Sequence, residues 1–263
     1  MLSRAADHAR IQARRKIGGA LALAVAIGWS PASHASDECY VEPEQLLESA
    51  HRLERMTRLV SAGAAIRIAA LGSSSTEGVG ATGVAQAYPA RMQRVLARLL
   101  PNSEVTVINK GVSGQDAREM LQRVDADVIA ERPDLVIWQT GTNSAIHGSD
   151  LGLFVEDLFL GIRRLQAEGI DVLMMGPQKS PRVDRAQQRS AFAQHLQVVA
   201  ETARIPYLAR YEIMAGWVAR QQMSMAEMID PDGLHMTDLS YRCLGEAAAK
   251  MIVNLSRAEI AHQ

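Results

Sequence analysis

Hydroxyl residues cluster directly after a short apolar stretch in the first third of the chain. Residues 64–70 are rich in alanine and isoleucine, and they continue into residues 71–78, Leu-Gly-Ser-Ser-Ser-Thr-Glu-Gly. An apolar run that ends in glycine and hydroxyl residues is typical of a buried strand that leads into a tight loop. A serine exposed on such a loop becomes a useful nucleophile only with a general base and with donors that stabilise the developing negative charge.

A candidate base lies near the other end of the chain, in residues 230–235, Asp-Pro-Asp-Gly-Leu-His. On a turn that leads into a helix, the spacing of Asp232 and His235 lets the carboxylate accept a hydrogen bond from one imidazole nitrogen. The other nitrogen is then available to take the serine proton. The rival histidines have no aspartate three residues earlier, although one of them follows Asn143 closely; they are His51, His147 and His195.

Two further segments offer hydrogen-bond donors. Residues 109–114, Asn-Lys-Gly-Val-Ser-Gly, follow a strand-like run at 105–108, and residues 141–144, Gly-Thr-Asn-Ser, follow another at 135–138. In a parallel α/β sheet the carboxyl ends of the strands open on one edge, where ligands bind. We therefore expect both segments to lie close to the serine loop.

In this order, the four segments resemble the sequence blocks of the SGNH hydrolases, also called GDSL-type esterases and lipases. The first block, usually Gly-Asp-Ser-x-Thr-x-Gly, is similar to residues 72–78 and places the nucleophile on Ser74. The glycine of the second block matches Gly114, and the Gly-x-Asn of the third block matches residues 141–143. The final Asp-x-x-His matches residues 232–235, so the resemblance covers roughly residues 64–260.

The resemblance also implies a role for each matching residue. The implied catalytic residues are Ser74, Asp232 and His235, and the implied oxyanion hole consists of the backbone N–H groups of Ser74 and Gly114 with the side-chain amide of Asn143. The alternatives are a plain turn glycine at Gly114, with Gly111 as the rival, and a turn-capping role for Asn143. The reaction needs no cofactor, and no His/Cys cluster has the spacing of metal ligands, so no metal is expected.

Two positions depart from the usual family pattern. Ser73 stands where an aspartate usually precedes the nucleophile, and Ser144 stands where an acidic residue usually follows the asparagine of the third block. Neither position is nucleophile, base or oxyanion donor, and we interpret both as altered support of the loops. They leave open a second class of function, in which the domain binds a glycan or a partner protein without catalysis.

The first 35 residues differ in composition from the rest. Basic residues at 14–16 precede an apolar run at 17–29, and small residues follow as far as Ala35. This pattern is typical of a secretory signal peptide, and the apolar run is short for a membrane span, with an uncleaved anchor as the alternative. We expect a signal peptide at 1–35, one SGNH hydrolase-like domain at 36–263, and a periplasmic or secreted protein.

The charge balance excludes one class of partner. Without residues 1–35, the chain has 23 basic and 28 acidic residues, a net charge of −5. A mildly acidic domain without a basic run or interleaved aromatic residues gives no electrostatic reason to bind nucleic acid. We expect an ester substrate as partner, with no nucleic acid and no stable membrane span after leader cleavage; the oligomeric state is not indicated.

Both cysteines lie in the expected mature chain, Cys39 near its start and Cys243 in the expected last helix. In an oxidising compartment they can form a disulfide, which on the chain-entropy model stabilises the fold by about 5 kcal/mol. The alternatives are two separate thiols, or Cys243 packed as a small core residue.

Strands and helices alternate along the rest of the chain, whose content of 48% hydrophobic and 22% charged residues is ordinary for a globular domain. We expect strands at residues 64–70, 105–108, 135–138, 172–175 and 206–208, and helices at 43–60, 85–100, 115–130, 151–168, 185–202, 211–222 and 239–257. This alternation predicts a single-domain, three-layer α/β/α sandwich with a parallel sheet. The resemblance adds a flavodoxin-like, five-stranded order, 2-1-3-4-5.

The expected activity is hydrolysis of short-chain O-acyl esters, acetyl esters above all, on a cell-envelope or extracellular polysaccharide. The resemblance equally permits a lysophospholipase or thioesterase, for which an acyl groove lined by apolar residues is needed; the candidates for its lining are Met223, Met225 and Met228. Core packing is the alternative for these methionines. Acyl transfer to a sugar hydroxyl uses the same triad and stays open.

Overall fold

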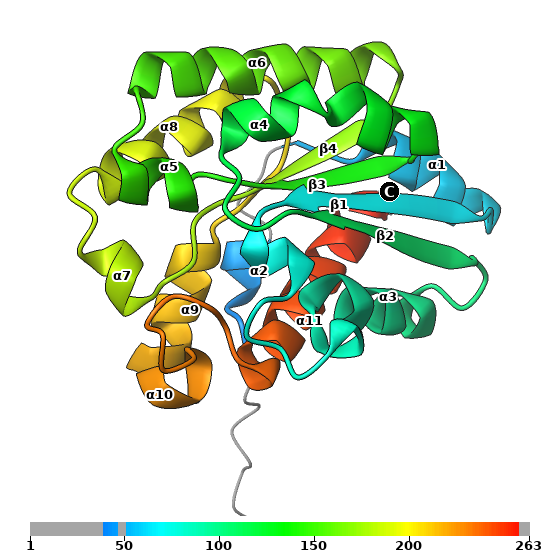
Figure 1. The fold of residues 1–263 in the computed structure, drawn as a ribbon. Coiled ribbons are helices and arrows are strands. Elements are labelled where there is room, and N and C mark those ends of the chain that lie inside the picture. The colour runs from blue at the N-terminus through cyan, green and yellow to red at the C-terminus, as the bar shows by residue number, and fades with distance from the viewer. Residues whose placement is uncertain (1–38, 47–50, 258–263) are drawn as a thin grey trace, which may run out of the picture. The chain divides into compact units, whose positions relative to one another are not determined.

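Five parallel strands form a central sheet in the computed structural model, which describes residues 39–46 and 51–257 (Figure 1). The strands are β1 (Ile66–Gly72), β2 (Val105–Gly111), β3 (Leu135–Gln139), β4 (Asp171–Met175) and β5 (Tyr207–Leu208). Their spatial order is β2-β1-β3-β4-β5, which confirms the expected order and the α/β fold. The expected signal peptide at 1–35 lies outside the described residues.

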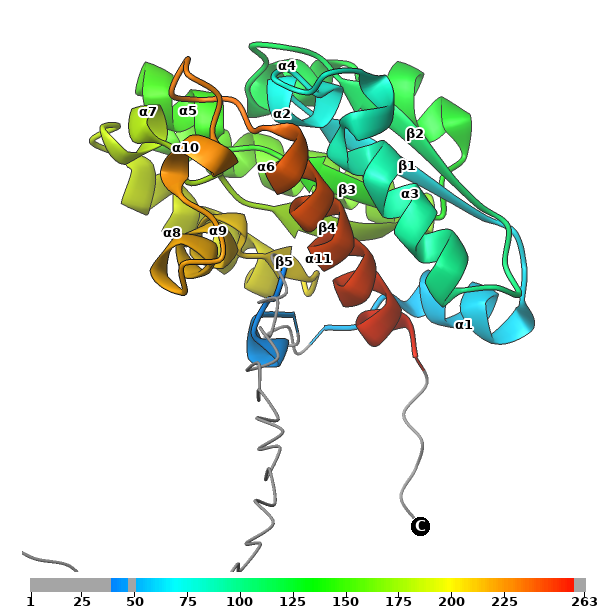
Figure 2. The same ribbon diagram turned by 90° about the horizontal axis from the view of Figure 1, so that it is seen from below.

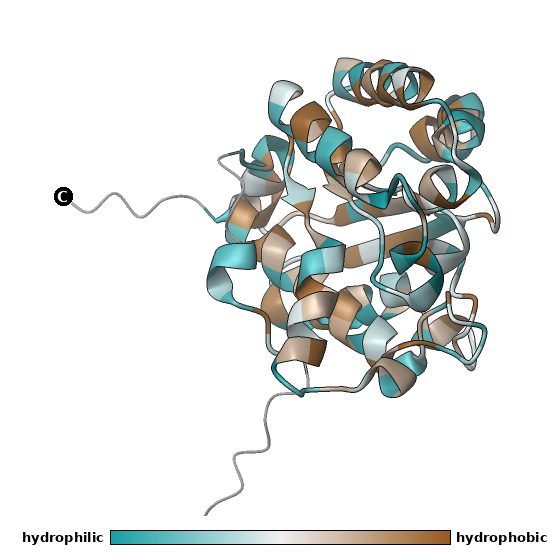
Figure 3. Cartoon of the chain, turned by 90° about the vertical axis from the view of Figure 1, so that its left-hand side faces the viewer, coloured by the Kyte–Doolittle hydropathy of each residue, from teal (hydrophilic) through white to brown (hydrophobic). Residues whose placement is uncertain are grey.

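The central strands are apolar on both faces, because helices cover the sheet on both sides. In β3, Leu135 and Ile137 contribute to one hydrophobic core, while Val136 and Trp138 contribute to the other. Side chains of a strand alternate between faces, and strands covered on both sides read as continuous apolar runs. Figure 3 shows these hydrophobic strand segments between the helices.

Two layers of helices enclose the sheet (Figures 1 and 2). One layer comprises α4 (Ala117–Gln122), the π-helical turn η3 (Val124–Val128), the 3-10 turn η4 (Ile129–Glu131), α5 (Thr142–His147), α6 (Leu151–Ala167) and α8 (Arg189–Thr202). The other comprises the 3-10 turn η1 (Pro43–Leu46), α1 (Glu54–Ala62), α3 (Tyr88–Leu99), α9 (Arg210–Ala219), α10 (Met225–Met228) and α11 (Asp238–Ser256). Three short elements complete the described chain: α2 (Ser74–Glu77), the 3-10 turn η2 (Val84–Gln86) and α7 (Pro181–Asp184).

The expected single helix at 43–60 is wrong, because η1 ends at Leu46 and α1 begins only at Glu54. Between them Leu53 has a non-helical backbone, with φ −97° and ψ 88°. Its N–H donates to the carbonyl of Leu255 at 3.3 Å and its side chain is buried. This tertiary contact with α11 overrides the apolar periodicity that favoured one continuous helix.

The expected helix at 115–130 is also divided. Helix α4 ends at Gln122, and the chain continues through the wider turn η3. Val124 and Val128 are both fully buried in the same core as α4 and α6. The wider turn therefore lets both valines pack inward, a result that helical periodicity alone does not predict.

A disulfide joins Cys39 to Cys243 of α11 across 204 residues of sequence. Next to it, the indole N–H of Trp217 donates to the carbonyl of Tyr40 at 3.1 Å. These two contacts attach the start of the described chain to α9 and α11. The structure thus favours the disulfide among the alternatives for the two cysteines.

Candidate active site

Ser74 is the first residue of α2, directly after the carboxyl end of β1. The position of Gly111 explains why this short helix can lie against the neighbouring strand: a Cβ there would fall 2.0 Å from the backbone nitrogen of Glu77. Ser74 itself is 8% exposed. The strand end therefore presents the serine hydroxyl at the edge of the sheet with little freedom to move.

The structure brings Ser74 together with His235 and Asp232, although 161 residues separate the serine from the histidine. The Oγ atom of Ser74 lies 3.0 Å from Nε2 of His235, and Nδ1 of His235 lies 2.5 Å from Oδ2 of Asp232. Asp232 orients the ring, and the ring faces the serine hydroxyl. This is the geometry that general-base activation of a serine requires.

Asp232 also organises the turn on which it lies. Its Oδ1 accepts hydrogen bonds from the backbone N–H groups of Leu234 at 2.7 Å and His235 at 2.9 Å. Partial burial opposes ionisation, but these two N–H groups and the imidazole outweigh burial and hold the pKa of Asp232 below its ordinary value. The carboxylate is therefore ionised at neutral pH and available to stabilise a protonated imidazole.

The turn that bears His235 is closed at its base and attached to the serine side of the site. Ile229 and Met236 form an antiparallel bridge, and the N–H of Asp230 donates to the carbonyl of His235 at 2.8 Å. The hydroxyl of Tyr241 in α11 donates to the carbonyl of Val79 at 2.7 Å. The position of the imidazole thus depends on α11 as well as on its own turn.

Three hydrogen-bond donors remain near the serine loop. Within the described residues, the backbone N–H groups of Ser74 and Gly114 have no hydrogen-bond partner. The side-chain amide of Asn143 donates to the carbonyl of Gln115 at 2.9 Å, which occupies one of its two hydrogens. The asparagine is thereby fixed beside the Gly114 loop, and its second hydrogen is left for another acceptor.

The rival glycine makes a different contact. The N–H of Gly111 donates to Oδ1 of Asn109 at 2.9 Å, so it is already satisfied. Gly114, by contrast, has a φ of +83° and is exposed. The geometry favours Gly114 over Gly111 as a donor to a bound substrate.

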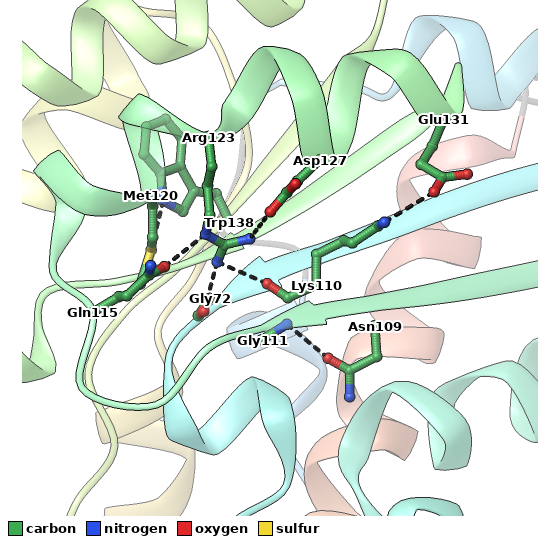
Figure 4. Close-up of polar contacts among 10 residues, drawn as sticks. All are labelled: Gly72, Asn109, Lys110, Gly111, Gln115, Met120, Arg123, Asp127, Glu131 and Trp138. Carbon is green, nitrogen blue, oxygen red and sulfur yellow. Dashed lines mark hydrogen bonds and ion pairs between the residues drawn. The ribbon is translucent and has the colours of Figure 1, made fainter.

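Arg123 links the loop that carries Gly114 to the strand ends, and Figure 4 shows its contacts with Gln115, Gly72 and Lys110. Its Nη2 donates to the carbonyls of Gly72 at 3.2 Å and Lys110 at 2.8 Å, and its Nε donates to Oε1 of Gln115 at 2.6 Å. The guanidinium also pairs with Asp127 at 3.2 Å. One side chain therefore connects the end of β1, the end of β2 and the loop that carries Gly114.

Sequence reasoning alone did not identify Arg123. Two of its four acceptors are backbone carbonyls, which every residue type provides, and one of these, Gly72, lies 51 residues away in sequence. On the opposite side of the loop, the carboxylate of Glu77 accepts hydrogen bonds from the backbone N–H and the hydroxyl of Ser113. The loop is thus held from both sides by charged groups.

The two family departures occupy supporting positions. The N–H and hydroxyl of Ser73 donate to Oε1 of Gln139 at 3.0 and 3.2 Å, and the hydroxyl of Thr76 donates to the same oxygen at 3.0 Å. Ser144 is buried in α5, and its hydroxyl has no hydrogen-bond partner among the described residues. Neither side chain contacts the Ser74 hydroxyl through a hydrogen bond.

The rival histidines have other contacts or lie in solvent. Nε2 of His51 lies 3.2 Å from the carboxylate of Glu201, and Nδ1 of His195 lies 2.8 Å from the carbonyl of Ala191. His147 is exposed at the end of α5. Among the four histidines that the structure describes, His235 alone contacts Ser74.

The methionines considered for an acyl groove lie mainly in the core. Met223 and Met228 are buried in the hydrophobic core beneath α11, and Met225 is partly buried against it. Four surface cavities have volumes between about 190 and 560 Å³, and Ser74 and His235 line none of these four.

Within the described ranges, no cluster of three or more His, Cys, Asp or Glu side chains could hold a metal ion. No helix in the same part of the chain is long and apolar enough to cross a bilayer.

Comparison with known proteins gives matches in both sequence and structure. The model of the non-GDSL lipase-like family matches residues 38–258. An acetylxylan esterase from Geobacillus stearothermophilus is 34% identical over 86 residues, which cover 32% of this chain and 39% of that protein. A two-domain esterase active on acetylated mannans has a similar fold, with a TM-score of 0.65, 20% identity, and coverage of 79% of this chain and 55% of that one.

A lipase/acylhydrolase from Enterococcus faecalis also has a similar fold, with a TM-score of 0.60 and 23% identity. The match covers 72% of this chain and 96% of that chain. The chain spans less than two thirds of the length of the acetylxylan esterase and of the two-domain esterase. At these identities, the structural matches support the fold.

Proposed function

Because the chain belongs to the non-GDSL lipase-like family, we propose that it is an exported serine esterase that hydrolyses short-chain O-acyl esters. Membership of this lipolytic family confirms the resemblance inferred from the four sequence blocks. The family name also agrees with Ser73 at the position where a GDSL-type motif has aspartate. The observation that carries the proposal is the continuous hydrogen-bonded path from Ser74 through His235 to Asp232.

In the first half of the reaction, His235 takes the proton of the Ser74 hydroxyl while the serine oxygen attacks the carbonyl carbon of the ester. The carbonyl oxygen becomes an oxyanion, which accepts hydrogen bonds from the N–H groups of Ser74 and Gly114 and from the amide of Asn143. His235 then gives its proton to the leaving alcohol as the ester bond breaks. The acyl group is left on Ser74.

In the second half, His235 takes a proton from water, and the resulting hydroxide attacks the acyl-enzyme. The oxyanion forms again at the same donors, the serine oxygen leaves with the proton held by His235, and the carboxylic acid is released. Asp232 stays ionised throughout and stabilises each imidazolium that forms. Losing one oxyanion donor of this kind typically costs about 3–4 kcal/mol of barrier.

The proposed substrate class is an acetylated polysaccharide. The sequence relative acts as an acetylxylan esterase, and one structural relative is active on acetylated mannans. The positions of Met223 and Met228 in the core agree with a small acyl group rather than a long chain.

Export is supported by the leader-like pattern at 1–35 and by the cysteine pair. A disulfide persists in secreted and periplasmic proteins, whereas the cytosol keeps most thiols reduced. The bond between Cys39 and Cys243 is therefore consistent with a periplasmic or secreted enzyme. Mass spectrometry of the non-reduced exported protein, with the N-terminal peptide sequenced, tests both the bond and cleavage after Ala35.

The activity is tested by hydrolysis of p-nitrophenyl acetate by residues 36–263 and by the Ser74→Ala variant. We expect the variant to lose almost all turnover while its circular dichroism spectrum stays unchanged. Ser61→Ala is the matched control, because Ser61 is exposed on α1. Equal rates in wild type and Ser74→Ala would contradict a serine esterase.

Substrate class is tested by the length of the acyl chain. We expect the highest kcat/KM for acetyl esters and a fall toward decanoyl esters, together with release of acetate from acetylated xylan or mannan. A rate that rises steadily toward decanoyl esters would instead indicate a lysophospholipase or thioesterase. Transfer of acetate to a sugar alcohol in place of water would indicate a transferase.

A further inference from the structure

Arg210 is a fully buried cation at the carboxyl end of β5. It is the first residue of α9, and its exposed fraction is 0%. Burial lowers its pKa to about 10, so the guanidinium is still charged at neutral pH. A buried charge must form hydrogen bonds or ion pairs with the groups around it, and the identity of these groups indicates the role of Arg210.

Four hydrogen bonds surround the guanidinium, and none of their acceptors is a carboxylate. Nε donates to the carbonyl of Gly176 at 2.8 Å, and Nη1 donates to the hydroxyl of Ser75 at 3.2 Å. Nη2 donates to Oε1 of Gln178 at 2.8 Å and to the hydroxyl of Thr142 at 3.5 Å. Among the described residues, Arg210 forms no ion pair, which is unusual because fully buried arginines are normally paired with an acid.

Two of the three side-chain acceptors are sequence neighbours of candidate active-site residues, and the third, Gln178, is hydrogen-bonded to such a neighbour. Ser75 follows Ser74, and Thr142 precedes Asn143. Gln178 uses its own amide to donate to the carbonyl of Leu234 at 3.3 Å, and Leu234 precedes His235. A single guanidinium is therefore linked to the nucleophile, to the oxyanion asparagine and to the base, in each case through an adjacent residue.

We propose that Arg210 is a positioning residue that fixes the serine loop, the asparagine loop and the histidine turn relative to one another. This inference rests on the proposed esterase function for its effect on rate. The planar guanidinium has five N–H donors in a fixed fork, so it can reach acceptors in the segments that follow β1, β3 and β4 at the same time. A lysine in this place would keep the charge but would lose the fork and most of these bonds.

A merely structural role would have a different signature. A residue that only stabilises the fold affects the sheet around β5 and α9, and the active-site loops respond no more than other segments. A positioning residue instead releases three loops that are far apart in sequence, at residues 73–78, 141–147 and 233–238. Hydrogen exchange of backbone amides distinguishes the two roles without any substrate.

The experiment compares Arg210→Met, Arg210→Lys and the control Arg98→Met, in which an arginine exposed on α3 is replaced. We expect faster amide exchange in all three loops of Arg210→Met, with slower exchange retained in β1 and β3. For p-nitrophenyl acetate, we expect kcat to fall by about 10²-fold, the scale of a small misplacement of reacting groups, while KM changes by less than about threefold. Arg210→Lys should show smaller changes than Arg210→Met in both amide exchange and kcat.

The inference is overturned if faster exchange is confined to β5 and α9 and kcat stays within about twofold of wild type. If the arginine variants do not fold, two other variants keep Arg210: Ser75→Ala removes its link to the serine loop, and Gln178→Leu removes its link to the histidine turn together with the bond from Thr142. Wild-type exchange and kcat in both variants would also overturn the inference. If wild type itself has no esterase activity, the proposed function fails, and the exchange pattern still decides whether Arg210 positions the three loops.

Discussion

Asp238 accepts two hydrogen bonds from Thr82, one from the backbone N–H at 2.9 Å and one from the hydroxyl at 2.5 Å. Asp238 is the first residue of α11 and lies three residues after His235, while Thr82 lies in the loop that follows the serine helix. The loop and the helix are therefore joined independently of the contact between Ser74 and His235. The contact between Thr82 and Asp238 therefore helps to fix the distance between Ser74 and His235.

The first prediction concerns this support. Thr82→Val removes the hydrogen bond of the hydroxyl at nearly constant side-chain volume. We expect kcat for p-nitrophenyl acetate to fall by about tenfold, because His235 is held less firmly. This is less than the roughly 10²-fold loss that a displacement of a full ångström can cause. Thr202→Val is the matched control, since its hydroxyl only bonds within α8. Equal kcat in both variants would show that the hydrogen bond between Thr82 and Asp238 does not contribute to the position of His235.

The second prediction concerns Asp232. Asp232→Asn should lower kcat by about 10³–10⁴-fold, because the imidazole loses the carboxylate that sets its tautomer and stabilises its charge. The pKa of Asp232 is lowered in the fold. Its ionised form therefore stabilises the native state at pH values above the ordinary pKa of about 3.9. That contribution is lost as the pH falls through the pKa of the folded state. The melting temperatures of wild type and variant should differ more at pH 6 than at pH 3. An unchanged difference would contradict this assignment.

The third prediction concerns the clamp on the Gly114 loop. Arg123→Met should lower kcat by about 10²-fold, on the scale of a lost oxyanion donor, because Gln115, next to Gly114, is no longer linked to the carbonyls of Gly72 and Lys110. Arg164→Met is the control, since Arg164 forms an exposed ion pair with Asp125. A lowered melting temperature with unchanged kcat would mean that Arg123 supports only the fold.

Most of the sheet could be predicted from the sequence, because β1, β3 and β4 are buried, largely apolar runs that lead into glycine or polar residues. The candidate site follows the same logic: Ser74 and Asn143 lie within four residues of the ends of β1 and β3, and parallel strands place those ends together. The serine, histidine and aspartate were predicted to lie together, and the structure places them within hydrogen-bonding distance. Their catalytic roles stay predictions until Ser74→Ala is measured.

The parts that could not be predicted depend on long-range contacts. The break at Leu53 follows from a bond to Leu255, about 200 residues later, which no local pattern indicates. Arg123 directly follows α4 and Arg210 begins α9, and both donate to groups distant in sequence, so their residue types alone do not reveal a role. For Arg210 a signal does exist, because a charged residue two positions after a buried strand stands at the edge where ligands bind.

The fourth prediction concerns the disulfide. Cys39→Ser with Cys243→Ser should lower the free energy of unfolding by up to about 5 kcal/mol on the chain-entropy model, since the bond closes a loop of about 200 residues. Urea unfolding of the double variant, compared with wild type with and without reductant, measures this loss. The contact of Asp238 with Thr82 holds the start of α11 without the disulfide, so kcat should stay close to wild type wherever the variant is folded. Equal stability of oxidised and reduced wild type would contradict the prediction.

The last prediction concerns Tyr88, which is fully buried next to Thr76. Burial raises its pKa to about 12, whereas an exposed tyrosine has a pKa of about 10. A raised pKa means that the neutral phenol stabilises the fold fully below pH 10, and that this contribution is lost as the pH rises toward 12. The difference in unfolding free energy between wild type and Tyr88→Phe should be constant from pH 7 to 9.

Above pH 10 that difference should decrease by about 1.4 kcal/mol per pH unit. The accumulated decrease is about 3 kcal/mol at pH 12. The comparison reports on the tyrosine, because the other groups that titrate in this range are present in both proteins. Urea unfolding at fixed ionic strength between pH 7 and 11.5 provides the measurement. A difference that stays flat through pH 11 would show that the phenol ionises freely in the fold, and therefore that Tyr88 is open to water.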